Sequence, residues 1–90
     1  MKINGTFVLR DIVDDHVLVP VGSTSVDFGG LVILNESGAM LWKVMEKDGE
    51  ADPERLADAL CDEYDCDRET ALADVGEFLR YLEDNDVLGQ

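Results

Sequence analysis

The spacing of apolar residues changes at Asn35, and this change constrains the fold more than any other feature of the 90-residue chain. Before Asn35, short runs rich in β-branched residues alternate with turn-forming residues, a pattern typical of strands. After Asn35, apolar residues recur every three or four positions, as they do in amphipathic helices. The sequence therefore predicts an α+β fold in one domain spanning residues 1–90.

Two short antiparallel β-hairpins, giving three to four strands, are predicted between about residues 6 and 34. In the first, the β-branched runs Phe7–Ile12 and His16–Val21 lie on either side of the acidic segment Val13–Asp15. Acidic pairs suit a turn, because their side chains bond to nearby backbone groups. This part of the chain is therefore expected to form a regular hairpin.

The second hairpin is predicted around Gly29-Gly30, because glycine readily adopts the positive φ that a two-residue turn requires. Its strands are Ser25–Phe28 and Leu31–Leu34. The run Leu31–Leu34 is apolar on both faces, so we expect other parts of the protein to cover both faces or one edge. If the edge is free, its backbone groups can pair with an added strand.

Three helices are predicted over about residues 36–48, 53–65 and 68–84. Asn35, Asp52 and Asp67 are suitable N-caps, because their side-chain oxygens accept hydrogen bonds from unpaired N–H groups of the first turn. Pro53 suits the first position of its helix. Together with the hairpins, these helices predict a winged-helix-like order of elements.

The third predicted helix contains an apolar stripe and one glycine whose presence inside a helix needs an explanation. The stripe contains Ala71, Val75, Phe78 and Leu82, and it is flanked by Leu72 and Leu79. Gly76 costs about 1 kcal/mol relative to alanine inside a helix. Two explanations remain open: close packing against another helix, or close approach of a bound chain.

The charge of −14 excludes several partners. Duplex DNA and anionic membrane surfaces attract cationic proteins, so the winged-helix analogy does not extend to DNA binding. No apolar run reaches about 18 residues and no secretory signal is apparent, so a soluble, cytoplasmic protein with no membrane partner is expected.

No residues predict catalysis or a cofactor. His16 is the single histidine, and Cys61 and Cys66 have a spacing that matches no common zinc or redox motif. The chain is therefore predicted not to be an enzyme and to bind no metal. One hypothesis is a winged-helix-like module for protein–protein interaction or regulation, with homodimerisation as one form.

The segment Leu34-Asn35-Glu36-Ser37-Gly38-Ala39, followed by Leu41-Trp42, resembles the PqqD family. The resemblance continues through Asp52–Leu56 and Tyr64-Asp65 to Asp74-Val75, Phe78-Leu79, Leu82 and Val87-Leu88. It implies a peptide chaperone, a RiPP recognition element that binds the leader of a precursor peptide and presents it to a modifying enzyme, often a radical S-adenosylmethionine (SAM) maturase. The hairpin from Phe7 to Val21 is more extensive than the family's shortest members need.

The resemblance also implies where the leader binds: as a strand beside the last strand of the sheet, against the third helix. At matching positions, the peptide-binding residues are then Leu31, Val32, Ile33, Leu34, Leu72, Val75, Gly76, Phe78, Leu79 and Leu82. Of these, Val75, Phe78 and Leu82 also fit a purely structural role in the core. Because N–H groups alternate along a strand, either Val32 or Ile33 donates toward the peptide, and the sequence does not decide between them.

Overall fold

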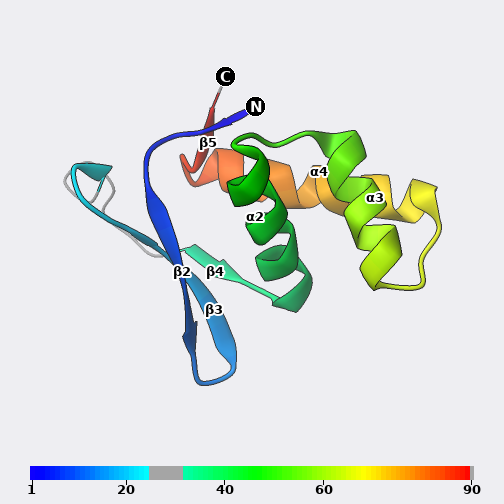
Figure 1. The fold of residues 1–90 in the computed structure, drawn as a ribbon, viewed down its shortest axis with the longest axis horizontal. Helices are drawn as coiled ribbons and strands as arrows, with labels where there is room; N and C mark the ends of the chain where they lie inside the picture. Colours follow the sequence, from blue (N-terminus) through cyan, green and yellow to red (C-terminus); the bar gives the residue numbers. More distant parts are fainter. Residues whose placement is uncertain (25–31, 90) are drawn as a thin grey trace.

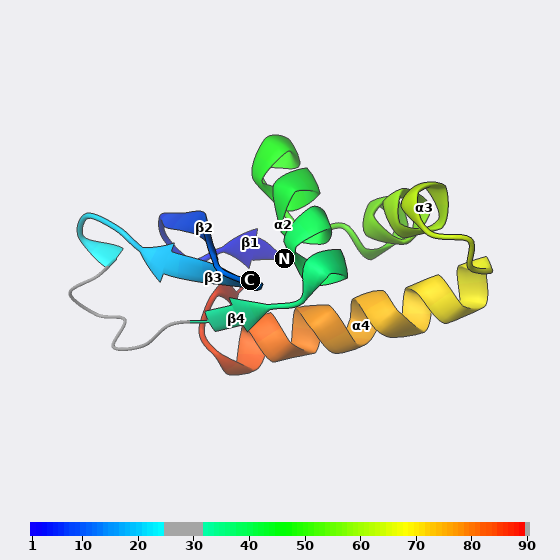
Figure 2. The same cartoon turned by 90° about the horizontal axis from the view of Figure 1, so that it is seen from below.

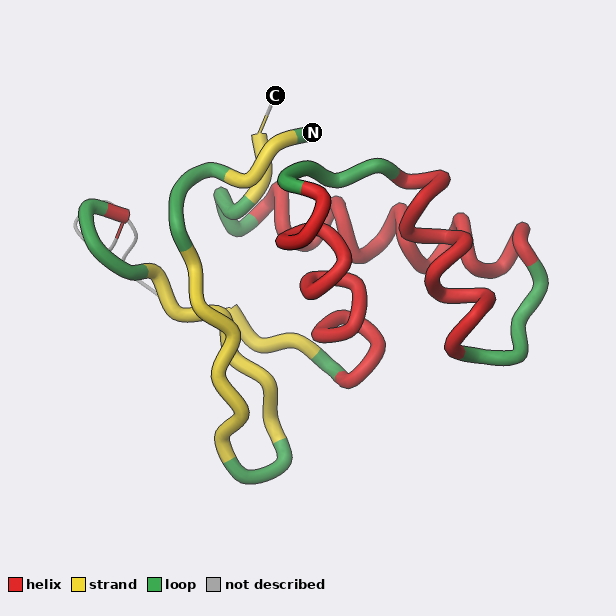
Figure 3. Tube along the Cα trace, viewed as in Figure 1, coloured by secondary structure: helices red, strands yellow, loops and turns green. Residues whose placement is uncertain are grey.

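The computed structural model describes residues 1–24 and 32–89 (Figures 1 and 3). A small antiparallel sheet precedes three helices, which confirms the predicted α+β class. The elements, in chain order, are β1 (Lys2–Ile3), β2 (Phe7–Ile12), β3 (Asp15–Pro20), β4 (Val32–Leu34), α2 (Glu36–Asp48), α3 (Pro53–Glu63), α4 (Arg68–Asp84) and β5 (Leu88–Gly89).

Within the described residues, the main sheet has the strand order β2-β3-β4, and both pairings are antiparallel. The β2–β3 hairpin turns at Val13-Asp14, as expected, and projects away from the helices (Figure 1). The predicted second hairpin falls largely on residues 25–31, outside the described residues. Its last part is β4, which pairs with β3 so that Ile33 lies opposite Val17. One edge of β4 therefore faces away from β3.

A second, two-stranded pairing joins the ends of the described chain. Ile3 in β1 lies opposite Leu88 in β5, and the backbone N–H of Asn4 donates to the carbonyl of Val87 over 2.8 Å. Val87 and Leu88 are buried, so this end of α4 is anchored to the core. Figure 2 shows α4 running along β4 and the start of α2.

Each helix begins at the residue that the sequence predicts as its cap. The side chain of Asn35 accepts from the N–H of Gly38, that of Asp52 from Glu54, and that of Asp67 from Thr70. These bonds satisfy N–H groups that have no partner within the helix. Among the described residues, no helix is both long enough and apolar enough to cross a membrane.

The core is centred on Trp42, whose side chain is almost fully buried between the sheet and the helices. Its indole N–H donates to Glu46 over 3.1 Å, and its ring meets Phe7 of β2 edge-on, with 6.1 Å between ring centroids. Leu18 of β3 and Met45 of α2 are fully buried in the same cluster. The core thus joins both halves of the fold.

Two expectations about apolar residues are corrected by the structure. Leu79, expected to flank the stripe of α4, is a core residue that is 4% exposed, while Phe78, expected at its centre, is only half-buried. The buried residues Ala71, Val75, Leu79 and Leu82 recur every three or four positions and thus form one face. In β4, Ile33 is 57% exposed, so the expected cover of both faces is wrong, whereas the other expectation, cover of one edge, agrees with the hydrogen bond from Tyr81 of α4 to the Ile33 carbonyl.

Gly76 lies on the exposed surface of α4, and a Cβ atom placed there would meet nothing within 4 Å. The explanation that Gly76 permits close helix packing is therefore wrong for the described residues. Its helical backbone needs no glycine, because its φ is not in the left-handed region.

Gly76→Ala is expected to stabilise the protein. Alanine fits the open space at this position and lowers the conformational entropy of the unfolded chain, which favours folding by up to about 1 kcal/mol. Urea unfolding followed by circular dichroism measures the change. A destabilised Gly76→Ala variant would show that the helix needs glycine at this position.

The carboxylate of Asp67 is expected to make the stability of α4 depend on pH. Its hydrogen bonds from Thr70 lower the pKa of Asp67 below the ordinary value of 3.8. Because the folded state favours the ionised form, this contribution is complete above pH 3.8 and is lost as the pH falls toward the lowered pKa.

Two variants separate the charge from the cap. Asp67→Asn keeps a good capping side chain, so it should match the parent near neutral pH and become the more stable of the two below pH 3.8. Asp67→Ala should be less stable than both near neutral pH. Unfolding free energies measured from pH 3 to 7 test this, and equal stability of all three proteins would contradict it.

Candidate functional site

A groove of about 630 Å³ lies between β4, the start of α2 and one side of α4. Its lining combines apolar side chains, two tyrosines and two carboxylates. The lining residues are Ile33, Leu34, Asn35, Ser37, Gly38, Leu41, Leu60, Tyr64, Cys66, Asp74, Glu77, Phe78 and Tyr81. The groove thus runs from the edge of the sheet to the end of α3.

The edge of β4 enters the groove through the backbone of Ile33. The hydroxyl of Tyr81 donates to the carbonyl of Ile33 over 3.0 Å, so this carbonyl points away from β3. In an antiparallel strand, the N–H and C=O of one residue point to the same side, and those of its neighbours point to the other. Ile33, rather than Val32, therefore presents its backbone groups to the groove.

The middle of the groove is shaped by the turn from β4 into α2. The carboxamide oxygen of Asn35 accepts from the N–H of Gly38 over 2.8 Å and from the hydroxyl of Ser37 over 3.1 Å. A Cβ atom at Gly38 would lie 3.1 Å from the ring of Phe78, which is tighter than ordinary contact. Glycine at this position therefore lets the Phe78 ring lie against the first turn of α2.

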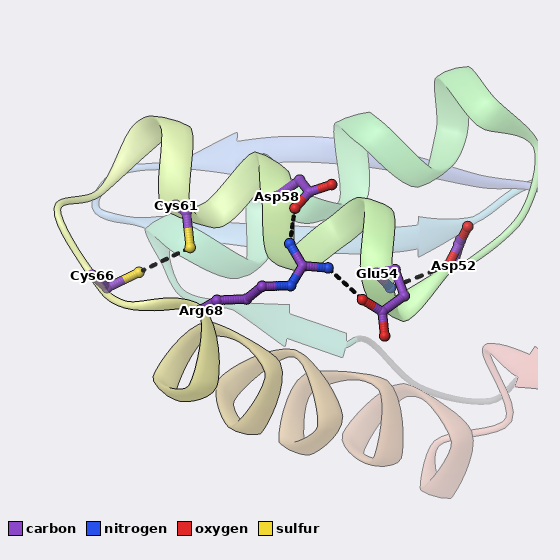
Figure 4. A network of polar contacts seen from close by, with 6 residues as sticks. All are labelled: Asp52, Glu54, Asp58, Cys61, Cys66 and Arg68. Atoms are coloured by element: carbon purple, nitrogen blue, oxygen red, sulfur yellow. Dashed lines mark hydrogen bonds and ion pairs between the residues drawn. The ribbon is translucent and has the colours of Figure 1, made fainter.

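The far end of the groove contains a free thiol. Cys66 lies 4.0 Å from the sulfur of Cys61, and both cysteines are free (Figure 4). Burial raises the pKa of the Cys66 thiol above 9.0, and Cys61 and the carboxylates of Asp67 and Asp74 raise it further. Cys66 is thus protonated near neutral pH and acts as part of the apolar lining.

Arg68 connects α4 to α3 at this end (Figure 4). Its guanidinium donates to the carboxylates of Glu54 and Asp58, and these two hydrogen bonds raise the pKa of Arg68. The three side chains are largely exposed, so water screens their attraction and these ion pairs add little to stability.

Among the residues predicted to bind a peptide, three line the groove: Ile33, Leu34 and Phe78. Leu72 and Gly76 lie on the other side of the buried stripe of α4 and do not line it, and Leu31 lies outside the described residues. The remaining four are core residues, each at most 4% exposed: Val32, Val75, Leu79 and Leu82.

The sequence reasoning missed the side of α4 that lines the groove. Asp74, Glu77, Phe78 and Tyr81 recur at intervals of three or four residues, so they share one face beside the core stripe. Only Phe78 is apolar, and a search for apolar residues passes over such a mixed face. The available signal was the tyrosine at position 81, which lies about 100° around the helix from the core residue Leu82.

Other parts of the described chain offer less to a ligand. A second hollow of about 510 Å³ lies between β2 and α2, beside Trp42, Lys43 and Glu46. His16 bonds to Asp11 across the β2–β3 hairpin; it lies opposite Leu34 in the sheet but is not among the groove-lining residues. No three His, Cys, Asp or Glu side chains of the described residues are arranged to hold a metal ion.

Comparison with known proteins identifies the family of this chain. Residues 15–88 match the family model described as coenzyme PQQ synthesis protein D (PqqD). No curated protein matches the chain. A solved structure described as TbiB1 in complex with the TbiA(beta) leader peptide is 32% identical, with a TM-score of 0.75; the match covers 98% of this chain and 94% of that one. The chain therefore belongs to the PqqD family.

Proposed function

We propose that this protein is a non-catalytic peptide chaperone, which binds the leader of a ribosomally synthesised precursor peptide and presents it to a modifying enzyme. The observation that carries the proposal is the outward-facing backbone of Ile33 beside an apolar groove. An extended peptide can add to such an edge through main-chain hydrogen bonds, while pockets beside the edge select its side chains. TbiB1, whose structure is similar, was solved with a leader peptide.

In this proposal the leader pairs with Ile33 and packs against α4. Ile33 is 57% exposed, and its side chain is covered when a strand lies beside it. Phe78 and Leu34 form the apolar floor on which the leader's own side chains rest. Binding thus removes exposed apolar surface from water and pairs backbone groups that face the groove.

Recognition of this kind requires no reactive side chain, so we assign the modification of the precursor peptide to a partner enzyme. We propose that this partner is a radical SAM maturase, as the family membership suggests, and that the two proteins meet in the cytoplasm, where precursor peptides are made. The alternative of a regulatory or homodimeric module uses the same edge of β4, with a second copy of the chain in place of the leader.

Ile33→Pro is expected to weaken leader binding by about tenfold or more. Proline removes the N–H that would donate to the leader, and its ring occupies the space beside the edge. Ile33→Thr keeps a β-branched residue and the backbone donor, so it should weaken binding much less. Calorimetric titration with a synthetic leader peptide measures both effects; candidate leaders are taken from short precursor genes sought near the gene for this chain.

Both variants are first checked for folding by circular dichroism and for oligomeric state by sedimentation. Equal leader affinity of the parent and a folded Ile33→Pro variant would place binding elsewhere. A parent dimer that Ile33→Pro converts to monomers, with no leader affinity in either form, would support the homodimeric alternative.

Tyr81→Phe is expected to bind the leader several-fold more tightly. In the free protein, the Tyr81 hydroxyl donates a hydrogen bond to the Ile33 carbonyl. A leader N–H that takes this acceptor must displace a hydrogen bond with a net worth of about 1 kcal/mol. Tyr64→Phe is the matched control, since Tyr64 also lines the groove. Weaker binding by Tyr81→Phe would instead show that the hydroxyl contacts the leader.

A further inference from the structure

The walls of the groove carry two carboxylates that no ion pair of the described residues engages. Asp74 and Glu77 both line it, one helical turn apart on α4, and no lysine or arginine is among the lining residues. The ion pairs of the described residues engage Arg55 and Arg68 with other carboxylates. A ligand in the groove therefore meets two carboxylates beside an apolar floor.

The order of groups along α4 gives the groove a direction. Tyr81 contacts the backbone of Ile33, Phe78 lies against the start of α2, and Asp74 lies near Cys66, at the other end. Because an α-helix rises about 1.5 Å per residue, Glu77 and Asp74 lie about 6 and 10 Å along the axis from Tyr81. An extended peptide covers these distances in about two and three residues.

We propose that the groove selects leaders in which a lysine or arginine lies two or three residues from the residue paired with Ile33. The cationic head meets Asp74 and Glu77, while apolar neighbours rest on Leu34 and Phe78. The inference rests on the proposed function and specifies its substrate class, a leader with one cation beside its apolar anchors. An acidic residue at the same place is repelled, which gives selectivity as well as affinity.

The probe is a display library of random peptides, selected on the intact chain and again on its Ile33→Pro variant. Peptides enriched by the parent alone define ligands that need the β4 edge. These ligands are expected to share apolar residues and a lysine or arginine at a fixed spacing. The best of them is then synthesised, together with a copy in which glutamine replaces the cation.

The charge contact is measured as a double-mutant cycle. The double variant Asp74→Asn/Glu77→Gln should bind the cationic peptide about five- to tenfold more weakly at low salt, in the range of two partly exposed ion pairs. It should bind the glutamine peptide about as well as the parent does. Glu83→Gln/Asp84→Asn is the control, because it changes the net charge equally with two α4 residues outside the groove lining.

The outcomes separate this inference from the proposed function. Two results would overturn the charge contact: selected peptides that need the β4 edge but share no cation, or an equal loss of affinity in both double variants. Either result would still agree with leader binding in the groove. Enriched peptides that bind the Ile33→Pro variant as tightly as the parent would overturn the groove itself. The proposal is supported if the cation of the peptide is coupled energetically to Asp74 and Glu77 and not to Glu83 and Asp84.

Discussion

A single residue, Asn35, separates β4 from α2, and the groove depends on this connection. Its side chain accepts hydrogen bonds from Ser37 and Gly38, so the helix begins immediately after the strand ends. Since Leu34 and the first turn of α2 are fixed relative to each other, the Phe78 ring of α4 can lie against Gly38. The edge of the sheet, the start of one helix and the side of another are thereby held together.

Two features limit unwanted pairing at the edge of β4, where we propose that the leader binds. Exposed strand edges promote aggregation, and proteins usually blunt them. In this chain, the Tyr81 hydroxyl bonds to the Ile33 carbonyl, and the net charge of −14 makes copies of the chain repel one another. In the proposed function, a leader N–H replaces this side-chain hydrogen bond, whose net worth is about 1 kcal/mol.

The sequence predicted where the helices and strands lie better than which of their faces are buried. The caps Asn35, Asp52 and Asp67 act locally, so residues adjacent in the chain were enough to locate the helix starts. The placement of Leu79 in the core, and of Phe78 and Tyr81 in the groove, depends on how α4 is rotated against α2 and β4. Long-range packing sets this rotation. The apolar stripe in the sequence indicates the buried face of the helix only approximately, so adjacent residues such as Phe78 and Leu79 can be assigned to the wrong face. The choice between Val32 and Ile33 required the contact with Tyr81 for the same reason.

The central claim is that a leader extends the sheet at Ile33, and nuclear magnetic resonance of the labelled complex tests it most directly. The account predicts cross-strand contacts between the leader backbone and Ile33, together with markedly slower hydrogen exchange of the Ile33 amide. It also predicts shift changes at Gly38, Phe78 and Tyr81, which adjoin that edge. Cross-strand contacts to β2 beside the second hollow, with unchanged exchange at Ile33, would contradict the account.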